Sequence, residues 1–204
     1  MRMNDESDEM TDTPTSNRIW VHEFSAPHAQ AFADAVFAIA ERDITLPIVA
    51  YIDSFGGEID GLATMMSAVD AVPNPFVTIA TGKAMSAGAI LLSHGDLRYV
   101  GQHARVMIHE ALGGAIGNVN DAKNDIAELD RLNEYFMGIL ATNCGKNLKN
   151  FKKLWQQNRE IYLGPAAAVK FGLADHIGIP IVRRVHGVSF DCLPPQSTKG
   201  RKNK

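Results

Sequence analysis

One serine of this chain lies among small residues at the expected junction of a buried strand and a helix. It is Ser86, in the stretch GKAMSAGA at residues 82–89. Unpaired N–H groups and the positive end of a helix dipole stabilise negative charge at such a junction, which suits a nucleophile. The stretch departs from the G-x-S-x-G elbow of the α/β-hydrolases, because Ala84 takes the place of the first glycine. Considered alone, a serine here is more often a helix N-cap than a nucleophile.

Two further segments could assist a nucleophile. Gly56 and Gly57 end the stretch DSFGG at residues 53–57, and adjacent glycines let a ligand approach main-chain N–H groups that could hold an oxyanion. A tight strand-to-helix turn is the simpler explanation of this pair. The apolar stretch RVMIH at residues 105–109 ends in His109, and a lone histidine at a strand end is usually structural. Six other histidines compete for any catalytic role, at positions 22, 28, 94, 103, 176 and 186.

Helical and strand patterns alternate along the middle of the chain. The predicted helices are 26–42, 58–71, 87–93, 119–143, 148–157 and 164–171, and the predicted strands are 47–53, 76–81, 97–100, 105–109 and 179–185. Helices and short buried strands in rotation predict an α/β domain with a largely parallel sheet. At a rise of about 1.5 Å per residue, the helix at 119–143 would be roughly 37 Å long. A helix of that length projects from so small a domain and invites a partner subunit.

The composition is that of one soluble domain. The chain has 204 residues, of which 46% are hydrophobic and 21% charged, and about 150 residues are usual for a domain. A formal charge of −3 provides no basic field for a nucleic-acid backbone. Cys144 and Cys192 are expected to be free thiols. Neither metal-ligand spacing nor a phosphate-binding GxxxxGK[ST] loop occurs in the sequence, so we expect no metal and no other cofactor.

The two ends of the chain differ from its middle. Residues 1–17 include five acidic side chains and are expected to form a flexible leader, and residues 187–204 a tail with a basic end. The leader lacks the positive region and apolar stretch of a signal peptide, and no apolar run approaches the roughly 18 residues of a membrane span. We therefore expect a cytoplasmic protein with no membrane partner and one ordered domain over residues 18–186.

Four motifs, in order, resemble the proteolytic subunit of the Clp protease family. They are GG at 56–57, GxAxSxGA at 82–89, RVMIH at 105–109 with LGG at 112–114, and GLAD at 172–175. The resemblance runs from about residue 19 to residue 177, nearly the whole expected domain. It implies a ClpP/crotonase-like α/β fold, a spiral of βα units with a projecting handle at about 113–145. It also implies a serine endopeptidase that cleaves peptides or unfolded proteins.

The resemblance implies a catalytic triad. Ser86 would be the nucleophile and His109 its general base, which takes the hydroxyl proton during attack and returns it to the leaving amine. The third member of the family's triad is an aspartate, and the matching stretch REIYL at residues 159–163 has Glu160 in that place. Its carboxylate is one methylene further from the backbone, so Glu160 needs a shifted backbone to reach His109.

The surroundings of the triad are implied by the same resemblance. The N–H groups of Gly56 and Ala87 would form the oxyanion hole, with Phe55 where the family usually has proline. The handle implies a homo-oligomer of two stacked heptameric rings, with Arg159 in contact across the rings. The residues implied to bind substrate by strand addition are Gly57, Leu112, Gly113 and Gly114.

An ATP-driven AAA+ unfoldase is the partner that the resemblance implies. The family uses a flexible axial loop and a short helix before its first strand to dock this partner. Here 18 residues precede Ile19, and they are acidic and lack the apolar pattern of that helix. A peptidase that acts alone, or on a dedicated substrate such as a phage capsid precursor, stays open.

Three other interpretations stay open as well. Glu160 could fail to reach His109, which would make the chain a catalytically silent ring subunit. A crotonase-type acyl-CoA enzyme shares the spiral fold and a glycine-dependent oxyanion hole, but it gives Ser86 and His109 no role. A related peptidase would use a lysine as base, for which Lys83 is the nearest in sequence.

Overall fold

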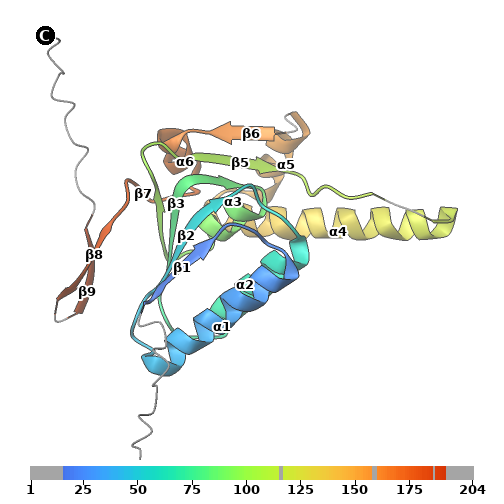
Figure 1. Ribbon diagram of the computed structural model, residues 1–204. Coiled ribbons are helices and arrows are strands. Elements are labelled where there is room, and N and C mark those ends of the chain that lie inside the picture. The colour runs from blue at the N-terminus through green and yellow to red at the C-terminus, as the bar shows by residue number, and fades with distance from the viewer. Residues whose placement is uncertain (1–15, 115–116, 158–159, 186, 192–204) are drawn as a thin grey trace, which may run out of the picture.

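Three parallel strands form the centre of the sheet in the computed structural model (Figure 1), which describes residues 16–114, 117–157, 160–185 and 187–191. Strand β2 (Ile48–Ser54) lies between β1 (Arg18–Val21) and β3 (Phe76–Met85). Alternate residues of a strand face opposite sides of the sheet. In β2, Ile48, Ala50 and Ile52 join the main core, and Val49 joins a smaller cluster. The α/β class with a largely parallel sheet, predicted from the alternation of patterns, is confirmed.

Strand β3 pairs with two different neighbours along its length. Its first half pairs with β4 (Leu97–Val100) and its residues 83–85 pair with β5 (Arg105–His109), both in parallel. The end predicted for this strand, at residue 81, is wrong, because β3 continues to Met85. The strand continues through small residues because Ala84 pairs with β2 on one side and with β5 on the other. The ladder therefore carries the chain in extended form up to Ser86.

Short strands complete the sheet. Strand β6 (Glu160–Leu163) is antiparallel to β5, and β7 (His176–Ile177) is parallel to β4. Neither β6 nor β7 was predicted from the sequence, because strands this short depend on their partners more than on their own residues. The strand predicted at 179–185 is β8 (Ile181–Val185), which pairs with β9 (Gly187–Asp191) in a separate hairpin instead of closing the sheet. Residues 187–191, expected to begin the tail, are β9.

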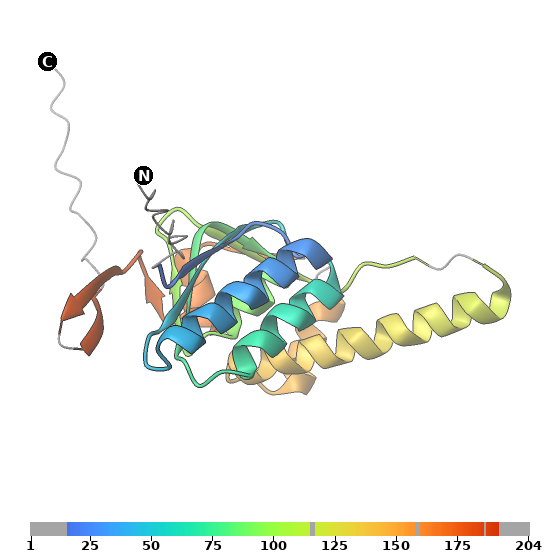
Figure 2. The ribbon, with the colours of Figure 1, turned by 60° about the horizontal axis from the view of Figure 1, so that its bottom comes forward.

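Two helices cover one face of the sheet. Helices α1 (Ala26–Arg42) and α2 (Ile59–Asp70) lie side by side, as Figures 1 and 2 show. The apolar positions of α1 recur at helical spacing, and their buried members, including Phe32 and Val36, join the main core. A smaller cluster, which includes Val49 and Tyr99, lies on the other face. The core thus fixes β2 and β3, the two strands that lead to the site.

Helix α4 (Val119–Asn143) begins and ends where the sequence predicted. Its N-terminal part extends away from the body of the molecule (Figures 1 and 2), and its three buried residues, Phe136, Leu140 and Ala141, lie toward its C-terminal end. Helix α5 (Leu148–Gln157) packs beside that end, where Lys152 pairs with Glu134. None of the helices in the described ranges is both long and apolar enough to span a membrane.

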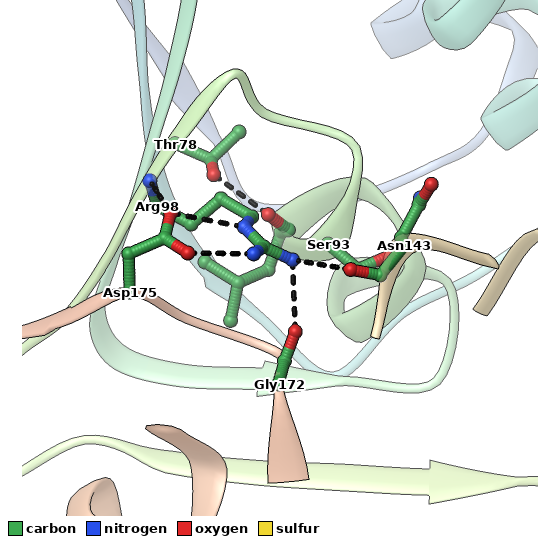
Figure 3. Close-up of polar contacts among 7 residues, drawn as sticks. Thr78, Ser93, Arg98, Asn143, Gly172 and Asp175 are labelled. Carbon is green, nitrogen blue, oxygen red and sulfur yellow. Dashed lines mark hydrogen bonds and ion pairs between the residues drawn. The ribbon is translucent and has the colours of Figure 1, made fainter. Parts of the chain in front are cut away.

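Arg98 ties the base of α4 to the sheet (Figure 3). Its guanidinium donates to both carboxylate oxygens of Asp175, at 2.6 and 3.1 Å, and to the main-chain oxygens of Asn143 and Gly172 at 2.9 and 2.8 Å. Asn143 is the last residue of α4, and Gly172 is the C-cap of α6 (Pro165–Phe171). One β4 side chain therefore joins two helix ends, and the GLAD motif supplies its carboxylate.

Some expectations concern residues outside the described ranges. These are the leader at 1–15, part of the glycine-rich segment at 115–116, the contact assigned to Arg159, the end of the tail at 192–204, and the thiol of Cys192.

Candidate active site

Ser86 occupies a strained turn between β3 and α3 (Ala87–Ser93). With φ 54° and ψ −122°, it is the one non-glycine residue with positive φ among those the structure describes. Such a conformation costs on the order of 1–3 kcal/mol and persists only where its surroundings enforce it. Here the Ser86 N–H donates to Met107 O of β5 at 2.8 Å. Ser86 is the N-cap of α3, yet its hydroxyl makes no capping hydrogen bond, so the helix cap does not account for this serine.

Gly56 lies directly against Ser86. A Cβ on Gly56 would come within 2.7 Å of Ser86 Cβ and 2.9 Å of Met85 O, and the residue has φ 104°. At Gly57, with φ 156°, a Cβ would come within 3.0 Å of the buried Phe24. Glycine is therefore required here by close contact as well as by backbone conformation. A strand-to-helix turn alone would not require the contact with Ser86.

The two N–H groups expected as oxyanion donors differ in their present partners. The Ala87 N–H, first in α3, has no acceptor within the described part of the chain. The Gly56 N–H donates to the hydroxyl of Ser54 at 3.0 Å, and Ser54 is fully buried. The nitrogen of Ala87 would lie 3.2 Å from a Cβ on Gly56, so the two residues are in close contact. An oxyanion at Ser86 would thus have one free donor and would compete with Ser54 for the other.

His109 lies at the end of β5, the strand next to Ser86. Because β3 and β5 pair Met85 with Met107, the chain brings Ser86 and His109 to the same end of two adjacent parallel strands, and both line one pocket. Burial lowers the pKa of His109 and the charge of Glu160 partly opposes that shift. The ring is therefore mainly neutral at pH 7, as a general base must be. Within the described residues, no hydrogen bond joins the side chains of Ser86 and His109.

Glu160 stands opposite His109 in the antiparallel ladder of β5 and β6. Cross-strand neighbours carry their side chains on the same face, with Cβ atoms roughly 4.5–5.5 Å apart. Glu160 Oε2 accepts a hydrogen bond from Tyr162 OH at 2.9 Å, which raises the pKa of Tyr162. Tyr162 lies in the stretch REIYL, and the sequence predicted no role for this residue. The alternation of EIYL, with Ile161 and Leu163 packed on the core, would have placed it beside Glu160 had this strand been predicted.

The pocket beside Ser86 and His109 has an apolar wall built by three helices. The wall consists of Ile59 and Leu62 of α2, Ile90 of α3, and Phe136, Met137 and Leu140 of α4. One further polar residue, Asn133 of α4, lines it and accepts the N–H of Ala111 at 2.6 Å. The sequence predicted α4 only as a handle. Its buried end is also part of this pocket, which the helical spacing of Asn133, Phe136 and Leu140 could have indicated.

Of the residues expected to bind substrate, Gly57 lines the pocket. Ala111 also lines it, and Leu112, Gly113 and Gly114 follow Ala111 in the segment after β5. Leu112 is 82% exposed. A Cβ on Gly113 would lie 3.2 Å from the Leu129 side chain of α4, whereas Gly114 has open space around it. Residues 110–114 belong to no helix or strand, which leaves their backbone able to pair with an extended peptide.

A direct serine–histidine contact lies at the surface, away from Ser86 and His109. Ser25 Oγ is 2.7 Å from His28 Nδ1, and Glu23 Oε2 is 3.5 Å from the same nitrogen. A catalytic triad needs both ring nitrogens, one toward the nucleophile and the other toward the acid. His28 and Glu23 are more than half exposed, and Ser25 is the N-cap of α1 outside the pocket. A serine–histidine contact is therefore not sufficient evidence of catalysis in this fold.

Lys83 is not placed to act as a neutral base. Its ammonium donates to Asp53 Oδ1 at 2.8 Å and lies 4.6 Å from the centre of the Phe55 ring. The hydrogen bond from Lys83 lowers the pKa of Asp53, so the carboxylate that engages this side chain is ionised at neutral pH. A lysine base must be an unprotonated amine, so these contacts do not favour the lysine-dependent alternative.

Other groups that could do chemistry lie elsewhere in the described ranges. No cluster of three or more His, Cys, Asp or Glu side chains there could hold a metal ion. Of the described histidines, only His109 lines the pocket with Ser86. Cys144 is a free thiol, and burial raises its pKa to about 11, which makes it a poor nucleophile at neutral pH.

A comparison with protein-family models matches residues 15–180 to the family described as Clp protease. The matched range contains every element from β1 to β7. It therefore includes the strained turn at Ser86, the pocket and Glu160, and it stops before the hairpin of β8 and β9.

Proposed function

This chain belongs to the Clp protease family and is thus a peptidase of the Clp type, and we propose that it is a serine endopeptidase with Ser86 as its nucleophile. One observation carries the proposal. The Ser86 hydroxyl, free of any capping role, sits in a strained turn and shares an apolar pocket with a half-buried histidine.

His109 acts as the general base in this mechanism. Its neutral ring takes the proton from Ser86 Oγ as that oxygen bonds to the substrate carbonyl carbon, and the carbonyl π electrons move to the oxygen. When the tetrahedral intermediate collapses, the C–N bond breaks and His109 gives its proton to the leaving amine. Water then attacks the acyl-Ser86 ester in the same way, so one water molecule is consumed for each peptide bond.

Glu160 and two main-chain N–H groups complete the site. Glu160 orients His109 and stabilises its imidazolium form, for which its place opposite His109 and its effect on the pKa of that ring are the support. Ala87 and Gly56 donate to the oxyanion, and Gly56 does so by releasing or sharing the bond to Ser54. Preorganised donors of this kind act on the charge that develops in the transition state.

The substrate is an unfolded protein or peptide held as an added strand. Gly57 lines the pocket, and Leu112, Gly113 and Gly114 follow the lining residue Ala111 in a segment without helix or strand, which suits such binding. The apolar wall from α2, α3 and α4 favours cleavage after an apolar residue. Members of the family generally form oligomeric rings. We propose two stacked heptameric rings joined through α4 and Arg159 in the cytoplasm, with an AAA+ unfoldase as partner or, alternatively, with the chamber acting alone.

One observation favours a second candidate, a catalytically silent ring subunit. The carboxylate of Glu160 is hydrogen-bonded to Tyr162, and no such bond joins it to His109 among the described residues. Tyr162→Phe frees the carboxylate, and Glu160→Asp restores the family's residue. An active enzyme keeps or gains activity in both variants, whereas a silent subunit stays inactive in both.

Peptide hydrolysis tests the proposal. We would incubate the assembled protein with fluorogenic peptides that differ only in the residue before the cleaved bond, and compare Ser86→Ala with the matched control Ser25→Ala. Each variant removes one serine hydroxyl from a helix N-cap position. We expect cleavage after apolar residues by the native chain and by Ser25→Ala, and none by Ser86→Ala. Equal activity in the two variants would exclude Ser86 as the nucleophile.

A further inference from the structure

The loop that carries Gly56 is held to β3 by the side chain of Lys83. The Lys83 ammonium donates to Asp53 Oδ1 at 2.8 Å and lies 4.6 Å from the centre of the Phe55 ring. Asp53 belongs to the end of β2, and Phe55 immediately precedes Gly56. Lys83 is three residues before Ser86 on β3. One side chain therefore connects the loop of the candidate oxyanion donor to the strand of the candidate nucleophile.

The surroundings of this contact accommodate it closely. A Cβ on Gly82 would come within 2.8 Å of Asp53 Oδ1, so glycine at that position leaves the room that the carboxylate occupies. The side chains of Lys83 and Asp53 are 22% and 37% exposed, so solvent and salt screen their charges only in part. Phe55 is 71% exposed, so burial does little to fix its ring. The Lys83 ammonium lies over the face of this ring.

We propose that Lys83 is a positioning residue for peptide hydrolysis, which clamps the Gly56 loop onto β3 and so fixes Gly56 against Ser86. The inference rests on the proposed function, because it assigns Lys83 to the geometry of the oxyanion site. Phe55 does not restrict its own backbone as a proline ring would. The contacts of Lys83 supply a restraint from the neighbouring strand.

The clamp has two consequences that a general contribution to folding does not have. Oxyanion donors act on the transition state more than on the bound substrate, so loosening Gly56 lowers kcat and leaves KM nearly unchanged. Because the clamp is electrostatic and partly exposed, salt weakens it. The kcat of the native chain therefore falls as salt is added, and a chain without the Lys83 charge does not show this dependence.

The experiment compares variants of Lys83 and Phe55 with a matched control. Lys83→Met removes the charge and keeps most of the side-chain length, Lys83→Arg keeps the charge, and Phe55→Leu removes the ring. The control is Lys146→Met, which also removes an ammonium stacked on a ring, at 4.8 Å from the centre of Phe171 and outside the pocket. We would measure kcat and KM on a peptide, and the rate of reaction with a fluorophosphonate, at low and high NaCl.

We expect Lys83→Met to lower kcat and the rate of reaction with the fluorophosphonate about tenfold. This loss is smaller than the roughly 10²–10³-fold loss of kcat when an oxyanion donor is removed outright. KM should stay within about twofold, Lys83→Arg should recover most of the loss, and Lys146→Met should resemble the native chain. The double variant Lys83→Met/Phe55→Leu should lose less than the product of the two single losses, because the two residues act through one contact.

Several results would overturn the positioning role. They are an unchanged kcat in Lys83→Met, an equal loss in Lys146→Met, and a loss that appears in KM alone. A native chain that neither cleaves peptides nor reacts with the fluorophosphonate would instead overturn the proposed function, and the role of Lys83 with it. The two failures are therefore distinguishable in one set of measurements.

Discussion

Gly56→Ala should disable the site by pushing its loop away from Ser86. The added Cβ would lie 2.7 Å from Ser86 Cβ and 2.9 Å from Met85 O, at a residue with φ 104°. Ser86 cannot yield easily, because its own turn is strained and its N–H is bonded to Met107 O. We therefore expect the Gly56 loop to move instead, and the N–H of Gly56 to leave the oxyanion position.

The magnitude follows from two separate costs. A left-handed backbone conformation costs a residue with a side chain about 1–2 kcal/mol, and overpacking of this kind adds about 1–3 kcal/mol. The free energy of unfolding should thus fall by roughly 2–5 kcal/mol, and Tm by about 2–4 °C for each kcal/mol in a chain of this size. The loss of one oxyanion donor should lower kcat by roughly 10²–10³.

Two other glycines make the assay decisive. Gly178 also has a positive φ, of 124°, but a Cβ there would meet nothing within 4 Å, and Gly138 in α4 has the same open space with ordinary helical geometry. Gly178→Ala should show the conformational cost alone and normal kcat, and Gly138→Ala should raise stability by about 0.5–1 kcal/mol. We would measure Tm and kcat for all three variants. If Gly56→Ala kept the kcat of Gly178→Ala, the assigned role of Gly56 would be refuted.

Three further predictions concern titrating groups. Glu160→Gln removes the charge that raises the pKa of His109, so the His109 ring stays neutral to lower pH. The acidic limb of the kcat/KM profile should therefore move to lower pH. No movement, or movement to higher pH, would contradict the electrostatic link between Glu160 and His109. At Asp175 burial raises the pKa, but the hydrogen bonds and charge of Arg98 outweigh it and the net pKa is lowered. Asp175→Asn should cost about 2 kcal/mol of unfolding free energy at pH 7, below the roughly 3–5 kcal/mol of a fully buried pair. In urea titrations this difference should shrink below about pH 4, as the carboxyl protonates through its lowered folded-state pKa, and a difference that did not depend on pH would contradict the ion pair. Cys144, with a pKa of about 11, should resist iodoacetamide in the native protein at pH 8 and react after denaturation. Peptide mapping would show the difference. Equal rates of alkylation in the native and denatured protein would contradict the burial of Cys144.

The elements that the sequence predicted well are those whose residues alone define a periodic face. Helix α1 and helix α4 carry apolar residues at regular helical spacing over several turns, and both begin and end as predicted. The end of β3 and all of β6 were not predicted, because small or mixed residues form a strand there only when β5 pairs with them. Such pairing depends on residues far away in the sequence.

Some residues of the candidate site were likewise predicted from local motifs, whereas others depend on contacts between distant parts of the chain. Ser86, Gly56 and His109 stand out through local motifs, and the ladder of β3 with β5 brings the serine and the histidine to one pocket. The contact of Lys83 with Asp53 spans 30 residues and depends on two strands lying side by side. The bond from the Ser86 N–H to Met107 O likewise joins residues of two neighbouring strands.

The most direct measurement is intact and peptide-level mass spectrometry of the assembled protein after brief exposure to a fluorophosphonate. Only a serine activated by a base beside oxyanion donors reacts rapidly with such a reagent. We predict one adduct per chain, on the peptide that contains Ser86, and its disappearance in Ser86→Ala but not in Ser25→Ala. An assembled protein that forms no adduct, or forms it at Ser25, would contradict the assignment of Ser86 as the nucleophile.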